Sequence, residues 1–134
     1  MPKVRTTDSK GLVQSAGAGL SIGGALVLER QTVASAGNDQ DTAGAIAGST
    51  PLVIATGGNG TTGVRLPAVA GLQSGQTFLI QNAAAGALEV YPATGDRIYP
   101  AADNAGITVA AYGFLQVTVL DATGWVGNEG VIAA

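Results

Sequence analysis

The stretch GVRLPAVAGLQSGQTFLIQNAAAGALEVYPATGDRIYP, residues 63–100, decides the fold class of this chain. Within it, apolar and polar side chains alternate over short segments, and glycine and proline separate one segment from the next. Phe78 and Ile80, for example, alternate with Leu79 and Gln81. Successive side chains of a strand point to opposite faces, so alternation with period two indicates a strand with one buried face. The stretch therefore predicts several short strands joined by turns.

The same alternation continues on both sides of this stretch. The predicted strands cover residues 52–55, 64–66, 77–81, 88–91, 107–110 and 114–121, and a last strand holds Trp125 and Val126. They recur every ~10–15 residues with turn signals between them, a spacing typical of antiparallel sandwiches and jelly rolls. Asn59-Gly60, inside the glycine-rich run GGNGTTG, is a β-hairpin signal. We therefore expect an all-β fold, an antiparallel β-sandwich of jelly-roll type.

The first forty residues differ from the rest. Residues 1–11 are polar, carry mixed charge and show no period. Residues 25–34 could form a helix, but the glycines just upstream and the β-branched content favour a strand. We therefore divide the chain into an extended N-terminal arm with the first strands, 1–40, and a β-sandwich domain, 41–134.

The composition excludes several classes of function. The chain has no cysteine and no histidine, so disulfides, thiolate nucleophiles and the commonest metal ligand are absent. Its net charge of −3 argues against nucleic-acid binding, which needs clustered Lys and Arg. No window reaches the ~18 consecutive apolar residues of a membrane span. We expect no cofactor, no metal, no nucleic acid and no membrane partner.

Candidate catalytic residues are few. Glu89 and Asp96 form the best carboxylate pair for glycoside hydrolysis, but the chemistry needs a separation that the sequence does not give. Asp39 and Asp41 lie in a turn that lacks the further ligands of a calcium loop. The run GGNGTTG has no lysine, so it is read as a turn and not as a phosphate loop. We predict that the protein is not an enzyme.

Four aromatic residues, Tyr91, Tyr99, Tyr112 and Trp125, allow two interpretations. They could form a platform on which sugar rings stack, which would favour a binding module. Tyrosine and tryptophan with one polar end are, however, more often packing residues. We favour packing.

The outward positions of the predicted strands carry Thr, Gln and Ala more often than Lys or Glu, and charged residues make up only 11% of the chain. Uncharged strand edges invite pairing with other chains unless they are covered. The composition therefore favours self-association, and closed symmetric homo-oligomers are the usual form.

Three segments carry a family resemblance. They are GVRLP at 63–67, the segment ALEVYPATGDRI at 87–98, and the late Trp125. Together they resemble a module of tailed-bacteriophage virion proteins of the head decoration or head-fibre type, over about residues 45–128. The pattern V-Y-P-x-x-G-D-x-I is the distinctive part, and the rest is general β patterning.

The resemblance implies a capsid decoration (cementing) protein that binds the head exterior as a homotrimer and stabilises the lattice. Its partners would be itself and the major capsid protein, and its location the capsid surface of the virion. We assign attachment to the arm, at Val4, Arg5, Leu12 and Val13. The alternative is a carbohydrate- or receptor-binding module of a phage tail fibre or spike. A polysaccharide-degrading enzyme is the weakest of the three hypotheses.

Overall fold

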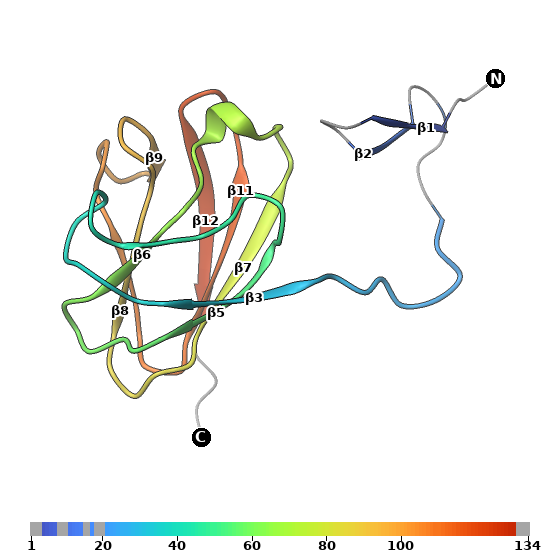
Figure 1. Ribbon diagram of the computed structural model, residues 1–134. Coiled ribbons are helices and arrows are strands. Elements are labelled where there is room, and N and C mark those ends of the chain that lie inside the picture. The colour runs from blue at the N-terminus through green and yellow to red at the C-terminus, as the bar shows by residue number, and fades with distance from the viewer. Residues whose placement is uncertain (1–3, 8–10, 15–16, 18–20, 131–134) are drawn as a thin grey trace.

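The protein is an all-β solenoid. The computed structural model describes residues 4–7, 11–14, 17 and 21–130, and two sheets wind around one core in about four turns (Figure 1). In chain order the elements are β1 (Val4–Thr7), β2 (Gly11–Gln14), β3 (Arg30–Ala34), β4 (Gly44–Ala45), β5 (Leu52–Thr56), β6 (Gly63–Arg65), the 3-10 helix η1 (Val69–Gly71), β7 (Thr77–Asn82), β8 (Leu88–Tyr91), β9 (Arg97–Tyr99), β10 (Ile107–Val109), β11 (Phe114–Val119) and β12 (Gly124–Gly130).

The first three turns are parallel. The chain passes alternately through a six-stranded sheet, where β3, β5 and β7 lie side by side, and a four-stranded sheet, where β4, β6 and β8 do. Arg30 pairs with Leu52, and Leu52 pairs with Leu79. The repeat is thus ~20–27 residues per turn, close to the shortest periods found in solenoid proteins.

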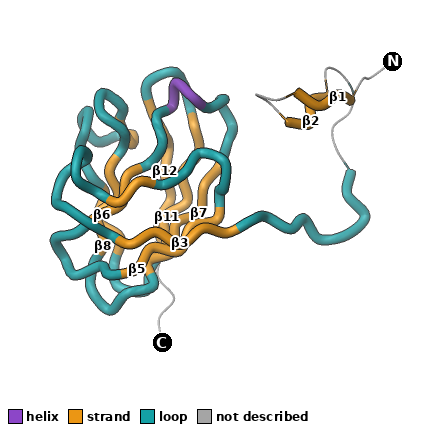
Figure 2. Tube along the Cα trace, in the orientation of Figure 1, coloured by secondary structure: helices purple, strands orange, loops and turns teal. Residues whose placement is uncertain are grey.

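The last turn reverses direction. β10 lies antiparallel to β8 in the four-stranded sheet, and β11 lies antiparallel to β7 in the six-stranded sheet. β12 returns beside β11 as a hairpin, and β9 pairs in parallel with β12 at the far edge. Figure 2 shows how short the strands are relative to the loops that carry the chain between the sheets. The reversed turn closes one end of the parallel stack.

The expected all-β class is confirmed, but the antiparallel jelly-roll sandwich is wrong, because five of the strand pairings are parallel. Period-two alternation identifies the buried face of a strand and does not identify its neighbour. A solenoid with two strands per turn has the same spacing between strands as a sandwich. Asn59-Gly60 does not form a hairpin, because β5 and β6 belong to different sheets. The Asn59 side chain instead accepts hydrogen bonds from the backbone N–H groups of Thr61 and Thr62, each at 3.0 Å.

The strand positions themselves are predicted well. The six strands expected between residues 52 and 121 lie within about two residues of β5, β6, β7, β8, β10 and β11, the ordinary uncertainty of such boundaries. The sequence reading missed β4 and β9, and the strand expected over 25–34 begins only at Arg30. β3 belongs to the six-stranded sheet, although it lies before residue 40. The division of the chain at that residue stays a prediction.

The core consists of inward-facing side chains that stack in register across neighbouring strands. Val53, Ile80 and Leu115 occupy facing positions on β5, β7 and β11, and all three are buried. Trp125 is fully buried and meets the ring of Phe78 edge-on, with 5.6 Å between centroids. The remaining buried apolar residues of the cluster come from both sheets and η1: Ile46, Ala55, Val64, Leu66, Val69, Leu88, Val90, Ile98, Val109, Val117 and Val119.

Among the described residues, Asn82 is the polar side chain that is buried in this core. Its Nδ2 group donates to the carbonyl oxygens of Gly86 at 2.9 Å and Ala110 at 3.0 Å, and its Oδ1 accepts from the N–H of Ala84 at 3.1 Å. One amide thus joins the β7–β8 turn to the β10–β11 turn. Because a buried amide is tolerated only when it is hydrogen-bonded, these bonds fix the relative positions of the two turns.

Candidate interaction surface

The four predicted attachment residues lie on the hairpin formed by β1 and β2. Its backbone register pairs Arg5 with Val13, and it places Val4 opposite Gln14 and Leu12 opposite Thr6. The side chains of these two strands lie outside the described part of the structure. The structure thus brings the four residues together on one small element, and their role in attachment stays a prediction.

Residues 21–29, here called the extension, join the hairpin region to β3. They have no regular secondary structure and all of them are exposed (Figure 1). Val27 is 88% exposed and Leu26 is 67% exposed, and Ile22 and Leu28 are each about half exposed. Single exposed apolar residues are common on protein surfaces, but contiguous ones indicate a surface that another chain covers. The extension is therefore a candidate contact segment.

A second candidate is the outer side of the six-stranded sheet, here called the uncharged face. Residues of β5, β7 and β11 alternate between the core and this side. Among the described residues, arginines stand at its two edges, Arg30 on β3 and Arg97 on β9, and no charged side chain lies between them. The residues between are Thr32, Ala34, Leu52, Ile54, Thr56, Thr77, Leu79, Gln81, Phe114, Gln116, Thr118, Val126 and Asn128.

The uncharged face combines apolar side chains with small polar ones. Leu79 and Val126 are 37% and 44% exposed, and the hydroxyl groups of Thr77 and Thr118 bond across β7 and β11 at 2.8 Å. An open hollow of about 330 Å³ lies over β11 and β12 and is lined mainly by Gln116, Thr118, Val126 and Asn128. Such a surface can be covered without burying a charge, which is the costly part of forming an interface.

The outer side of the four-stranded sheet is different, because its polar groups bond to each other. Thr108 donates to the carboxylate of Glu89, and Arg65 donates to the carbonyl oxygen of Gln40 at 3.0 Å. The Tyr91 hydroxyl donates to the carbonyl oxygen of Asn38 at 2.8 Å. Burial, and then the nearby carboxylates of Glu89 and Asp39, raise the pKa of Tyr91. This side is charged and internally paired.

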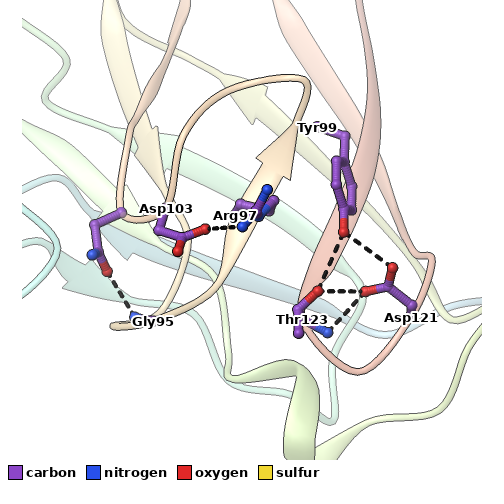
Figure 3. Close-up of polar contacts among 7 residues, drawn as sticks. Gly95, Arg97, Tyr99, Asp103, Asp121 and Thr123 are labelled. Carbon is purple, nitrogen blue, oxygen red and sulfur yellow. Dashed lines mark hydrogen bonds and ion pairs between the residues drawn. The ribbon is translucent and has the colours of Figure 1, made fainter.

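A polar cluster surrounds β9 and the β11–β12 turn (Figure 3). Tyr99 donates to the Asp121 carboxylate at 3.1 Å, and Arg97 pairs with Asp103 at 2.6 Å. The backbone N–H of Thr123 and then its hydroxyl donate to Asp121, and these bonds lower the pKa of the Asp121 carboxyl. The acids of this cluster accept hydrogen bonds from the chain itself, which accounts for them structurally.

The predicted carboxylate pair is held by separate partners. Glu89 accepts from Thr108 on the four-stranded sheet, whereas Asp96 accepts from the backbone N–H of Val69 at 3.0 Å. Asp39 accepts from the N–H of Thr42 at 2.9 Å. Within the described ranges, no three acidic, histidine or cysteine residues gather as a metal site. Asp39 and Asp96 thus anchor loop segments, and Glu89 joins two neighbouring strands.

The four aromatic residues do not form a common platform. Trp125 lies in the core, and the hydroxyl groups of Tyr91 and Tyr99 are bonded to the protein. Tyr112 is 62% exposed in the β10–β11 turn, with a φ of 58° that is unusual for a residue other than glycine. A stacking surface built from all four would require Trp125 to leave the core.

Sequence reasoning missed the two surfaces that the structure makes prominent. The strand predicted over 25–34 overlaps the extension, although the run Ala25-Leu26-Val27-Leu28 lacks alternation and follows two glycines. That lack of period was the available signal. The uncharged face follows from the polar positions already noted, but its extent depends on strand order, which the sequence does not reveal.

Comparison with known protein families and with curated proteins gave no match to this chain. None of the described helical residues forms a segment long and apolar enough to cross a bilayer.

Proposed function

We propose that this protein is a non-enzymatic component of a phage virion, a decoration protein that binds the capsid exterior as a homotrimer and stabilises the lattice. The observation that carries the proposal is the exposed extension, uncharged over residues 21–28, which joins a separate hairpin to a closed β-solenoid. The arrangement suits a protein that functions by contact. The sequence resemblance over about residues 45–128 supplies the class of partner.

Each part of the chain has a role in this proposal. The solenoid body is a rigid spacer, and each hairpin of the trimer contacts the major capsid protein through Val4, Arg5, Leu12 and Val13. A short hairpin offers little area, so each contact is weak alone. Once one hairpin is bound the others bind intramolecularly, which raises the overall affinity by about 100–10,000-fold.

The proposal is tested by sedimentation with capsid shells assembled from the major capsid protein encoded in the same genome. Full-length protein is expected to sediment with the shells in a fixed ratio to capsid subunits. Deletion of residues 1–12 is expected to abolish sedimentation while the fluorescence of the buried Trp125 shows an intact body. Thr108→Ala, on the outer side of the four-stranded sheet and outside the hairpin, is the control and is expected to bind normally. Binding that survives the deletion contradicts the assignment of the hairpin.

The alternative, a glycan-binding module of a tail fibre or spike, is favoured by one observation. Tyr112 is exposed at a turn and adopts a backbone conformation that costs energy, and such positions cluster at binding sites. A glycan array probed with the intact protein tests this directly. Binding that is lost in Tyr112→Ala would favour the alternative over capsid decoration.

A further inference from the structure

We infer that residues 22–28 of one copy of this protein lie across the uncharged face of a second copy. The inference deepens the proposed function by naming the surfaces that hold the copies together, and it rests on the self-association which that function requires. Its observations are the four exposed apolar side chains of the extension and a sheet face without charge between its two edges.

The two surfaces match chemically. Residues 21–28 contain no charged side chain, and the first charges after them are Glu29 and Arg30. The uncharged face presents Leu52, Ile54 and Leu79 on neighbouring strands. Covering it with the extension therefore removes apolar surface from water on both sides and leaves no ion buried.

The extension also has the required length. Residues 21–29 can reach ~30 Å when extended, at ~3.3 Å per residue. Six strands span five spacings of ~4.8 Å, so the sheet is ~24 Å wide. One extension can thus cross the whole face from edge to edge and pass over the hollow between β11 and β12.

Area favours exchange of extensions over simple stacking of two faces. A face ~24 Å wide and five residues long covers only ~400 Å², about half of the ~800 Å² that each partner contributes to a standard interface. A strand-like segment ~30 Å long and ~10 Å wide adds ~300 Å². A copy that both receives an extension and donates one buries ~600 Å², within the usual range around the standard value. When the exchange is closed around a symmetry axis, every copy does both.

Cross-linking tests the arrangement, because the chain has no cysteine and any introduced thiol is unique. Val27→Cys and Leu79→Cys proteins, carrying tags of different length, are co-expressed and treated with a short bismaleimide. A mixed product of two chains is expected on denaturing gels. Val27→Cys co-expressed with Thr108→Cys, on the other side of the body, is expected to give none. If the variant carrying both Val27→Cys and Leu79→Cys closes within a single chain instead, the extension covers its own face and the inference is overturned.

Light scattering provides the second measurement. The full chain is expected to show a multiple of 13.1 kDa, and Leu79→Glu is expected to show 13.1 kDa. Ala85→Glu is the control, because Ala85 is exposed but lies in the β7–β8 turn and not on the uncharged face. Its mass is expected to stay that of the wild type. A wild-type mass of 13.1 kDa, or equal masses for wild type and Leu79→Glu, overturns the inference.

The two proposals fail separately. Cross-linking and light scattering use purified protein without capsid, whereas the proposed function is read by sedimentation with shells. A chain that assembles through its extensions but does not bind shells retains the inference and loses the decoration role. A chain that binds shells as a monomer retains the capsid binding and overturns the inference.

Discussion

Replacing Asn82 by alanine tests whether one buried amide holds the reversed last turn on the parallel stack. Asn82 is fully buried at the end of β7, and its side chain bonds to the β7–β8 turn through Gly86 and to the β10–β11 turn through Ala110. Alanine keeps the backbone conformation and removes every side-chain hydrogen bond. The two turns then have no shared polar anchor.

The expected loss follows from the bonds. The three shorter hydrogen bonds, of 2.9, 3.0 and 3.1 Å, each contribute about 1 kcal/mol net to stability, and a longer one to the Val109 carbonyl oxygen, at 3.4 Å, is lost with them. The groups left without a partner add a desolvation penalty of about 1–3 kcal/mol wherever water does not reach them. A loss of about 3–6 kcal/mol is therefore expected. For a domain of this size it corresponds to a fall in Tm of at least about 12 °C.

Urea unfolding followed by Trp125 fluorescence measures this loss, because the single tryptophan is buried in the core and reports on the body alone. The midpoint is expected to fall with an unchanged slope. Gln73→Ala is the matched control, an exposed amide in the loop after η1, and is expected to change stability by less than about 0.5 kcal/mol. A loss below about 1 kcal/mol in Asn82→Ala would refute the role assigned to the amide.

Three further changes test the local geometry. Gly63→Ala places a Cβ 2.6 Å from the Glu89 carbonyl oxygen and 2.7 Å from the Tyr91 ring, so thermal unfolding should show a loss of stability of about 1–3 kcal/mol. The control Gly71→Ala, with open space around the new Cβ, should lose less than about 0.5 kcal/mol. Because burial raises the pKa of Tyr91, its phenol should ionise above the ordinary pKa of about 10 in an ultraviolet titration, and Glu89→Gln should bring the transition closer to that value. The stability that the protonated phenol contributes should be lost as pH rises past about 10. Because the hydrogen bonds of its own turn lower the pKa of Asp121, its contribution to stability is present above about pH 3.9 and should be lost as pH falls below that value, and an NMR titration showing an ordinary carboxyl pKa would contradict this.

The sequence is informative about strands and not about their partners. Phe78 and Ile80 point inward as their alternation predicts, and so do Leu115 and Val117. The parallel pairing of β5 with β7 leaves no mark on that pattern, because an inward-facing residue reads the same beside a parallel or an antiparallel neighbour. The turns differ in length from one solenoid turn to the next, so the repeat is irregular and hard to see in the sequence.

The missed strand β9 shows a second limit. Its residues Arg97, Ile98 and Tyr99 contain one apolar residue between two polar ones, which is too short for a period to be recognised. What makes it a strand is its parallel neighbour β12 together with the contacts of Tyr99 to Asp121 and Thr123. These are long-range interactions, so local sequence does not contain them. The same holds for the uncharged face, which exists only once the strand order is known.

The two ends of the solenoid are not equivalent, and this asymmetry links the fold to both proposals. One edge of the six-stranded sheet is β9, a strand of three residues whose Arg97 is paired with Asp103. The other edge is β3, a strand of five residues that continues directly from the extension. Short edges resist pairing with other chains, whereas longer ones invite it. The β9 edge is therefore protected, and the end of the body that carries β3 is the end from which the chain reaches another molecule. A variant that lacks residues 1–29 would keep the solenoid and lose both its capsid contact and its contact to a second copy.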